Sequence, residues 1–457
     1  MRTTFIIPFL LFAFSTFSTF AAEPTSTALS DAYFQQFHLT PAPAPSGLVL
    51  KRGDRLAICG DSITEQKKYS RLMEDYLTAC VPQLEISVRQ FGWGGETVPG
   101  FLARMTNDCL RFKPTIATTC YGMNDHHYQP YADWIGDAYR TNTLAMVAAF
   151  QAAGTRVILG SPGCIAKIPW WEAGKYQLDD LNLNLCQLRN IDVEIAARKN
   201  LGFADMFWPL LTSRAAAMKA YGENYALTGG DGIHPDWAGH LIMAWVFLKS
   251  MGLDGNIGTF SVDIKADSMR VSAGHKLVSH RDGDFVIRSS RYPFCPCAPM
   301  GLAADWYPTC GSDNITNNDS IRSGMTLVPF NRDFNRMILV ATNGTASRYL
   351  VSWGDNSKLF TAQQLAQGIN LPAEFPQNPF SAAFSFVDAA VAAKQDFETR
   401  EMKALFRLTG DSQPTMKQII ARTDAVVRPA EKEHAVLEAA VHNAFIPVTY
   451  DLKIEAR

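Results

Sequence analysis

The sequence predicts an α/β fold in which a parallel sheet carries helices on both faces. Strand-like apolar runs alternate with helical periods from about residue 55 to residue 252. Connections of that length join parallel strands through helices. Glycine-containing polar loops follow several of the runs, as at the carboxyl edge of such a sheet. The alternation stops after Gly252, so the remainder of the chain is predicted to be an addition to this α/β domain.

The α/β domain is assigned to residues 54–257. Its strand-like runs are 56–60, 84–91, 115–121, 155–160 and, more weakly, 201–205. Helical periodicity of apolar residues fills the gaps at 68–81, 98–110, 131–153, 178–200 and 237–250. The last helix follows Pro235-Asp236, which makes Asp236 its expected N-cap.

The rest of the chain divides into two regions by pattern. Residues 258–356 hold short runs separated by Gly, Asn, Asp and Pro, which predicts antiparallel β structure. These runs are 260–264, 284–288, 325–330, 337–341 and 348–353. Residues 357–457 are predicted to be mainly helical, with helices at 361–367, 383–406, 413–423 and 430–444 and a closing strand at 448–454. Neither region carries a motif that assigns a function.

Composition and charge exclude several classes of partner. The chain has 457 residues, 47% of them hydrophobic, which suits a globular protein with a large core. Lys+Arg 42 against Asp+Glu 44 gives a net charge of −2, and no basic tract stands out. We therefore expect no nucleic-acid partner and no binding to an anionic membrane surface.

The N-terminus has the pattern of a secretory signal peptide. Arg2 precedes a mostly apolar run from Phe5 to Phe20, and small residues follow at Ala21-Ala22. The alternative, a membrane anchor, is disfavoured by Pro8 and by the short length of the run. We predict a signal peptide at 1–22, a secreted or periplasmic location, a lead-in segment at 23–53 and no membrane span in the mature chain.

The nine cysteines are an odd number, so at least one thiol must stay free in an exported chain. Cys295, Cys297 and Cys310 lie in a loop-rich segment and are the better disulfide candidates, whereas Cys59 and Cys120 are expected to pack in the core. A metal site at the loop cluster would need a fourth ligand, and none has suitable spacing. We therefore predict no metal site.

The turn Gly60-Asp61-Ser62 lies between the first strand and the first helix. A serine at such a turn can expose its hydroxyl above the carboxyl edge of the sheet. The alternative is that Ser62 or Thr64 only caps the helix. Two further loops favour the chemical interpretation.

The first of these loops contains Asp231-Gly232-Ile233-His234. Serine needs a base to become a nucleophile, and histidine can act as that base near neutral pH when a carboxylate orients it. An Asp and a His three residues apart in a glycine-containing turn can both point into one crevice. Taken alone, the pair could also be a capping aspartate and a surface histidine.

The second loop contains Gly122-Met123-Asn124-Asp125, after the 115–121 strand. An acyl-transfer enzyme needs hydrogen-bond donors for its oxyanion, and the side-chain amide of Asn124 could supply one. A backbone N–H in the glycine loop Gly92-Trp93-Gly94-Gly95 could supply another, because glycine lets the backbone approach a substrate closely. Glycine- and asparagine-rich turns are also ordinary βα loops, so each is weak evidence alone.

Together these four blocks, over about residues 54–250, resemble the SGNH (GDSL-type) hydrolase family. The resemblance implies a flavodoxin-like three-layer α/β/α sandwich without metal or organic cofactor. It implies Ser62 as nucleophile, His234 as general base and then acid, and Asp231 as its orienting partner. It also implies an oxyanion hole made by the backbone N–H groups of Ser62 and Gly95 and the side chain of Asn124.

The sequence departs from the family pattern at two places. Ile63 follows the serine where Leu is common, and Gln90 stands where many members carry Asn before the glycine loop. The second change predicts a different support for that loop. No G-x-S-x-G surrounds Ser62, which argues against the nucleophile elbow of ordinary α/β-hydrolases.

Aromatic residues in the predicted active-site loops indicate the substrate class. Asp61, Trp93, His126 and His127 are candidate substrate contacts, and Tyr128, Tyr131, Trp170 and Trp171 lie in loops on the same side. Such rings suit sugars, although any one of them could instead pack its loop. We predict a secreted serine esterase that deacetylates a small or polymeric carbohydrate. The alternatives are a lipase or lysophospholipase-type esterase and a catalytically degenerate binding module.

Overall fold

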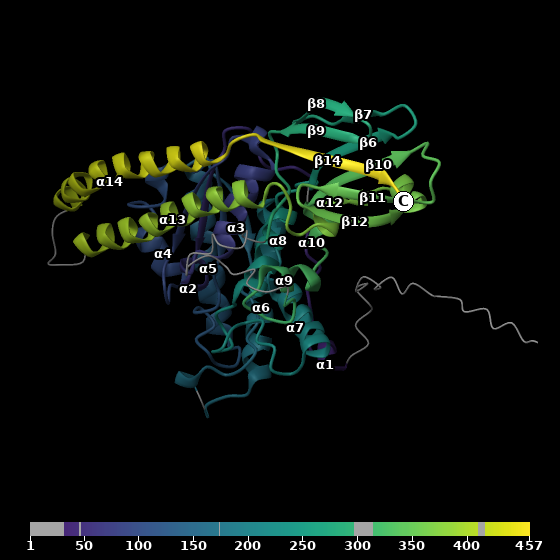
Figure 1. Ribbon diagram of the computed structural model, residues 1–457. Helices are drawn as coiled ribbons and strands as arrows, with labels where there is room; N and C mark the ends of the chain where they lie inside the picture. Colours follow the sequence, from purple (N-terminus) through teal and green to yellow (C-terminus); the bar gives the residue numbers. More distant parts are fainter. Residues whose placement is uncertain (1–31, 45–46, 173, 297–313, 410–415) are drawn as a thin grey trace, which may run out of the picture. The chain divides into compact units, whose positions relative to one another are not determined.

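The computed structural model describes residues 32–44, 47–172, 174–296, 314–409 and 416–457. Contacts divide the chain into two units, residues 1–36 and 37–457. Of the first unit, the described part forms one short helix, α1 (Ala32–Gln35). The predicted signal peptide lies outside the described residues. The second unit contains the rest of the described fold (Figure 1).

The second unit is built on a five-stranded parallel sheet in the order β2-β1-β3-β4-β5. Its strands are β1 (Arg55–Gly60), β2 (Ser87–Gly92), β3 (Ile116–Cys120), β4 (Arg156–Gly160) and β5 (Gly202–Ala204). The sheet begins with β1; β2 is added on one side of β1, and β3, β4 and β5 are added in turn on the other. Because each connection between parallel strands is right-handed, growth in these two directions places helices on both faces of the sheet. The predicted α/β fold is confirmed.

Helices connect these strands. They are α2 (Ser62–Glu65), α3 (Tyr69–Asp75), α4 (Val98–Arg104), α5 (Asp133–Ala152), α6 (Leu178–Lys199), α7 (Phe207–Tyr221) and α8 (Trp237–Ser250), with single helical turns at 76–80, 82–84, 110–112 and 170–172. The helix predicted at 98–110 breaks after Arg104. Helix α7 was not predicted, because its apolar residues are spread around the helix and form no single stripe.

The strands are buried on both faces, as a parallel sheet requires. On one face, alternate residues such as Ala57 and Cys59 pack in a core with α4, α5 and α6, which includes Phe101. On the other face, Tyr69 of α3 stacks on Phe247 of α8 with ring centroids 5.5 Å apart. The sheet is therefore held rigidly between two helical layers.

Strand register brings the ends of the strands to one level. Gly60 of β1 pairs with Gly92 of β2 and with Cys120 of β3, and Cys120 pairs with Gly160 of β4. The loops that follow these residues therefore start side by side. They include the turn at Ser62, the glycine loop and the loop at Asn124.

Two further sheets follow in the C-terminal region, in the orders β13-β10-β6-β7 and β12-β11-β14-β9-β8. Their strands are β6 (Asn256–Asp263), β7 (Ser268–Val271), β8 (His275–Arg281), β9 (Asp284–Ser289), β10 (Arg336–Thr342), β11 (Arg348–Trp353), β12 (Asn356–Thr361), β13 (Ile369–Asn370) and β14 (Val448–Ala456). All pairs are antiparallel except β6 with β10, which pair in parallel. Strand β14 lies between β11 and β9, so the end of the chain completes a sheet begun much earlier.

Two predictions for this region are wrong. The run 325–330 is not a strand: it covers the end of α9 (Ile321–Leu327) and the start of α10 (Phe330–Phe334). The Ser320 side chain caps α9 by accepting the N–H of Ser323, and Pro329 separates the two helices. The helices predicted at 413–423 and 430–444 are one helix, α14 (Met416–Ala444), which runs through Pro429. Short helices α11 (Ala362–Gln367) and α12 (Leu371–Glu374) complete the region.

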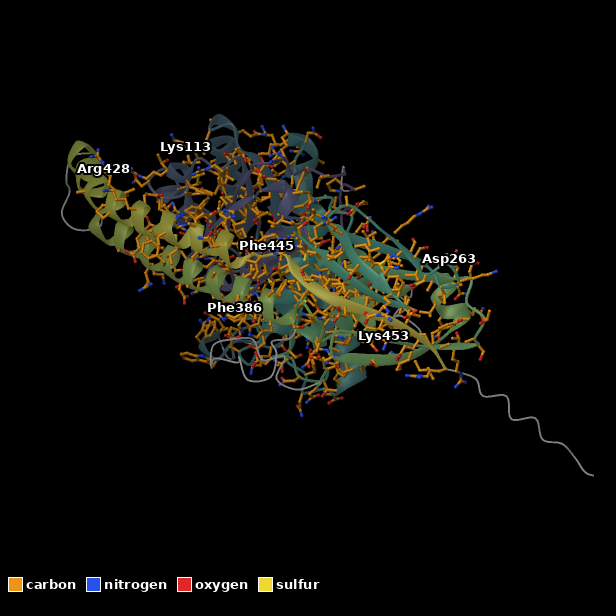
Figure 2. All side chains as sticks on the ribbon, turned by 45° about the horizontal axis from the view of Figure 1, so that its top comes forward. Lys113, Asp263, Phe386, Arg428, Phe445 and Lys453 are labelled. Atoms are coloured by element: carbon orange, nitrogen blue, oxygen red, sulfur yellow. The ribbon has the colours of Figure 1, made fainter. Side chains whose placement is uncertain are left out.

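Helix α14 forms a hairpin with α13 (Ser381–Thr409), and Figure 1 shows the two helices running alongside each other. Figure 2 places Phe386 on α13 and Arg428 on α14. Helix α13 covers the open edge of the central sheet. Lys394 Nζ donates to the carbonyl of Val88 in β2, and the N–H of Gln90 donates to Glu398 at 3.0 Å. Side chains of α13 thus form hydrogen bonds with backbone groups of the edge strand β2, which could otherwise pair with a strand of another chain.

A buried ionic cluster fixes the hairpin to α3. Lys394 is fully buried and lies 2.7 Å from Glu74, 3.1 Å from Glu398 and 3.1 Å from Glu438. Burial alone would lower its pKa, but the three carboxylates outweigh burial and raise the pKa of Lys394. The ammonium therefore stays charged and holds carboxylates of α3, α13 and α14 together.

A second buried carboxyl at this contact makes stability depend on pH. Asp75 of α3 lies beside Asp388 of α13, which accepts hydrogen bonds from Arg71. Burial, followed by the charge of Asp388, raises the pKa of Asp75 well above its usual value. Such a group contributes stability that is complete below its unfolded pKa of about 4 and is lost as pH rises through its folded pKa. Asparagine has no proton to lose, so Asp75→Asn should not show this loss. The difference in free energy of unfolding between Asp75→Asn and the wild type should therefore shift in favour of the variant by up to about 1.4 kcal/mol for each pH unit by which the pH rises within this window.

Urea unfolding of both proteins from pH 4 to pH 9 checks this expectation. Asp282→Asn, at an exposed carboxylate on a turn, is the control and should show no comparable trend. A difference between Asp75→Asn and the wild type that stayed constant over the whole pH range would contradict the buried-acid explanation.

Two remaining expectations concern cysteines and membranes. Cys295 is a buried free thiol within hydrogen-bonding reach of the carbonyl of Pro293, so its predicted disulfide is not formed, and Cys297 and Cys310 lie outside the described residues. In the part of the chain that the structure describes, no helix combines the length and apolar character needed to span a bilayer.

Candidate active site

The nucleophile turn is built by glycine and by a helix cap. A Cβ at Gly60 would lie 2.1 Å from Thr64 Oγ1, so only glycine allows β1 to end this close to α2. The Asp61 side chain then accepts the N–H of Ile63 at 3.0 Å and caps α2, which begins at Ser62. This leaves the Ser62 hydroxyl partly exposed at the carboxyl edge of the sheet.

Three side chains form a continuous hydrogen-bonded chain at this edge. Ser62 Oγ lies 2.7 Å from His234 Nε2, and His234 Nδ1 lies 2.6 Å from Asp231 Oδ2. The predicted meeting of Ser62, Asp231 and His234 is therefore present across 172 residues of sequence. With Nδ1–H donating to Asp231, Nε2 is free to accept the Ser62 proton.

The Asp231 loop is rigid for local reasons. Asp231 Oδ1 accepts the N–H groups of Ile233 at 2.9 Å and His234 at 3.0 Å, so the carboxylate organises its own turn. A Cβ at Gly229 would lie 1.8 Å from the His234 carbonyl oxygen, so only glycine allows the backbone at residue 229 to pass this close to the backbone at His234. Partial burial opposes ionisation, but the hydrogen bonds from His234 and Ile233 prevail and lower the pKa of Asp231. Asp231 is therefore a carboxylate that can stabilise an imidazolium.

The predicted oxyanion donors lie in loops that leave the same edge of the sheet. Asn124 Nδ2 donates one hydrogen to the Glu96 carbonyl at 3.0 Å, which fixes the amide and leaves its second N–H available. Gly95 is exposed and has φ +72° in the glycine loop. Glu96 anchors the end of this loop through buried Arg104, 2.6 Å away, and through Tyr121 at 2.9 Å.

Two of the four candidate substrate contacts point inward. Asp61 is buried, and burial, followed by the nearby charges of Asp125 and Glu96, raises its pKa to about 7. His126 is fully buried with Nδ1 donating to the Met123 carbonyl, and burial lowers its pKa to about 3, so the ring is neutral. This placement argues against direct substrate contact by either side chain. Both side chains instead support the loops that carry them.

The other two candidates lie nearer the surface. His127 is exposed and packs on Trp134 with ring centroids 5.0 Å apart, while Trp93 is half-buried beneath the cation of Arg104. Tyr128 lies within reach of Asn124 Oδ1, at 3.4 Å, and its ring contacts Trp171. Aromatic side chains therefore extend outward from the loop that carries Asn124.

Several residues around the site escape sequence reasoning. Glu65 accepts the N–H of Gly94, and Lys403, 338 residues away, donates to the same carboxylate. Only the Gln90 departure signalled that the glycine loop is supported differently: Gln90 accepts the N–H of Gly92 at 2.9 Å and donates to Thr399 on α13. Among the residues described, no cluster of three or more His, Cys, Asp or Glu side chains is arranged to hold a metal ion.

Comparison with known proteins agrees with this geometry. Residues 58–242 match the model of the GDSL-like Lipase/Acylhydrolase family. An acetylxylan esterase of Geobacillus stearothermophilus is 26% identical over 222 residues, which cover 44% of this chain and 95% of that protein. The solved structure of a gut microbial diltiazem-metabolizing enzyme superposes with a TM-score of 0.70 at 21% identity, covering 91% of this chain and all of the other, so the two share a fold that includes the C-terminal region. Residues 58–242 thus form a GDSL-like lipase/acylhydrolase domain, and the chain is a serine carboxylic ester hydrolase.

Proposed function

We propose that this chain is an exported esterase that removes acetyl groups from carbohydrates through an acyl-enzyme on Ser62. The observation that carries the proposal is the hydrogen-bonded chain from Ser62 Oγ through His234 to the ionised Asp231. Export is proposed from the sequence of residues 1–22, which lie outside the described residues.

The proposed reaction has two halves. His234 Nε2 takes the Ser62 proton as Oγ attacks the ester carbonyl, and the resulting imidazolium gives that proton to the leaving alcohol. Water, deprotonated by His234, then attacks the acyl-enzyme and releases acetate and Ser62. The N–H groups of Ser62 and Gly95 and the Asn124 amide donate to the oxyanion in both halves. Asp231 stays ionised throughout and stabilises the imidazolium.

Two observations support a carbohydrate as the alcohol. The acetylxylan esterase relative matches over nearly its whole length. The rings near the site are also unusually exposed: 80% for Trp170, 53% for Trp134 and 37% for Trp171. Exposed, adjacent indole rings present flat faces on which the C–H groups of a sugar can pack, whereas an acyl-chain site would need an enclosed apolar groove.

The experiment that tests the proposal compares substrates. Acetate release is measured from acetylated xylan, acetylated pectin and simple sugar acetates, and p-nitrophenyl esters of two to twelve carbons give the acyl-chain preference. We expect acetyl esters to be hydrolysed fastest. A preference for long acyl chains would instead identify a lipase-type esterase, and failure of a fluorophosphonate probe to label Ser62 would indicate a degenerate binding module.

Trp171 provides a sharper test of the carbohydrate subsite. Its ring contacts Tyr128, which reaches Asn124, so it connects the exposed rings to the site. Trp171→Ala should raise KM for acetylated xylo-oligosaccharides about five- to tenfold, because one stacking contact of about 1 kcal/mol is lost. Hydrolysis of p-nitrophenyl acetate, which has no sugar ring, should change less than twofold. Equal losses on both substrates would argue against a sugar platform.

A further inference from the structure

The glycine loop closes on one turn of its own, in which the N–H of Glu96 donates to the carbonyl of Trp93 at 3.1 Å. Gly94 and Gly95 are adjacent and exposed, and a Cβ at Gly95 would have no neighbour within 4 Å. Glycine peptides rotate readily because no side chain restricts them. The turn bond joins the residues on either side of the two glycines and does not hold the peptide between them. The direction of the Gly95 N–H therefore also depends on contacts from outside the loop.

Glu65 contacts the loop at Gly94, immediately before Gly95. The N–H of Gly94 donates to Glu65 Oε2, and a Cβ at Gly94 would come within 2.9 Å of that oxygen. Glu65 is the last residue of α2, the helix that begins with Ser62. One carboxylate thus joins the nucleophile helix to the peptide unit immediately before Gly95.

Lys403 of α13 holds this carboxylate in place. Its Nζ donates to Glu65 Oε1 and lies 5.4 Å from the centroid of the Trp93 ring in the same loop. The side chains of Lys403 and Glu65 are 36% and 22% exposed, so solvent screens the pair only partly. Without the ammonium, an unpaired negative charge would stand next to the place where the oxyanion develops.

Other side chains of α13 support both ends of the loop. Thr399 accepts from Gln90 Nε2, and Gln90 accepts the N–H of Gly92 at 2.9 Å. Arg104, which anchors Glu96, also directs an N–H at the Met402 sulfur, 2.9 Å away. Three neighbouring residues of α13 therefore support the loop: Thr399 through Gln90 at its start, Lys403 through Glu65 at Gly94, and Met402 through Arg104 at its end.

We infer that Lys403 is a positioning residue for ester hydrolysis, which acts through Glu65 to hold the glycine loop in its donor geometry, and that α13 is thereby part of the catalytic machinery. The inference rests on the proposed function, in which the Gly95 N–H donates to the oxyanion. It assigns a role to a region of the chain outside the hydrolase domain.

The main test replaces Lys403 by methionine. Lys403→Met should lower kcat for p-nitrophenyl acetate about tenfold, with KM changed less than twofold, because the loop serves the transition state more than the bound substrate. Affinity for a short alkylboronic acid, whose tetrahedral serine adduct occupies the oxyanion site, should fall by a similar factor. Lys403→Arg should restore both quantities to within about threefold of the wild type.

Two further variants separate positioning from general effects. Arg400→Met removes an exposed cation from the same helix, and kcat should stay within twofold of the wild type. Glu65→Gln combined with Lys403→Met should lose less kcat than Lys403→Met alone, because the unpaired carboxylate is gone while a side-chain oxygen remains for Gly94.

If Lys403→Met lowered the melting temperature but left kcat and boronic acid affinity unchanged at a temperature where it is folded, the contact would be merely structural and the inference would be overturned. An inactive Ser62→Ala together with a fully active Lys403→Met would overturn the inference and leave the proposed function standing. An active Ser62→Ala would overturn both.

Discussion

Ser62→Ala is expected to lower kcat for acetyl ester hydrolysis by about 10⁵- to 10⁶-fold, the scale seen when a serine nucleophile is removed from a triad. The change deletes only the Oγ that lies 2.7 Å from His234 Nε2. Helix α2 should persist, because its cap is the Asp61 side chain and not the serine. The melting temperature should therefore stay within a few degrees. Initial rates with p-nitrophenyl acetate and thermal unfolding by circular dichroism measure the two effects.

Ser290→Ala is a matched control, since Ser290 is an exposed serine in the C-terminal region whose hydroxyl donates to the Gly274 carbonyl at 3.1 Å. It should retain full activity. A fluorophosphonate probe should label the wild type and Ser290→Ala but not Ser62→Ala. If Ser62→Ala kept both labelling and turnover, another residue would be the nucleophile.

The sequence located this site well because its parts follow strand ends. Parallel strands in register bring their carboxyl ends to one edge, so loops after β1, β2 and β3 must meet wherever they occur in the chain. The positions of Ser62, Gly95 and Asn124 followed from this rule once the strands were recognised. The direction of individual side chains did not follow: Asp61 and His126 belong to the same loops, yet the fold turns both inward.

Contacts between distant segments were not predictable from local pattern. Lys394, Lys403 and Asp388 look like ordinary charges on an amphipathic helix, and a single sequence gives no sign that they face α3, β2 and Glu65. Their partners in α2, α3 and β2 are more than 300 residues away. The same limit explains β14, which was recognised as a strand although its neighbours β9 and β11 could not be named.

Misread elements have a local cause. The run Met325 to Phe330 is apolar enough for a strand, and periodicity cannot separate a short apolar strand from the ends of two short helices. The decisive features are the Ser320 cap and Pro329, which organise helices on either side of the run. Such capping contacts outweigh the strand propensity of so short a segment.

Asp231→Asn is the second change with a very large expected effect, about 10⁴-fold in kcat. The reason lies in how the Asp231 oxygens are used. Oδ1 accepts two backbone N–H groups, at 2.9 and 3.0 Å, and only an oxygen can remain there. The asparagine NH₂ must then face His234 Nδ1 and forces the tautomer that is protonated on Nε2. In that tautomer Nε2 can no longer accept the Ser62 proton.

Asp236→Asn is the matched control, because Asp236 is also a half-buried carboxylate, two residues after His234 in the chain, but pairs with Lys68 at 3.1 Å and Asn318 at 2.8 Å instead. The kcat of Asp236→Asn should stay within about threefold of the wild type. For Asp231→Asn, kcat should fall while KM changes little. An ¹⁵N NMR spectrum of labelled histidine reports the tautomer of His234 independently of turnover. A fully active Asp231→Asn, or an inactive one that kept the Nδ1–H tautomer, would show that this carboxylate does not act by orienting the base.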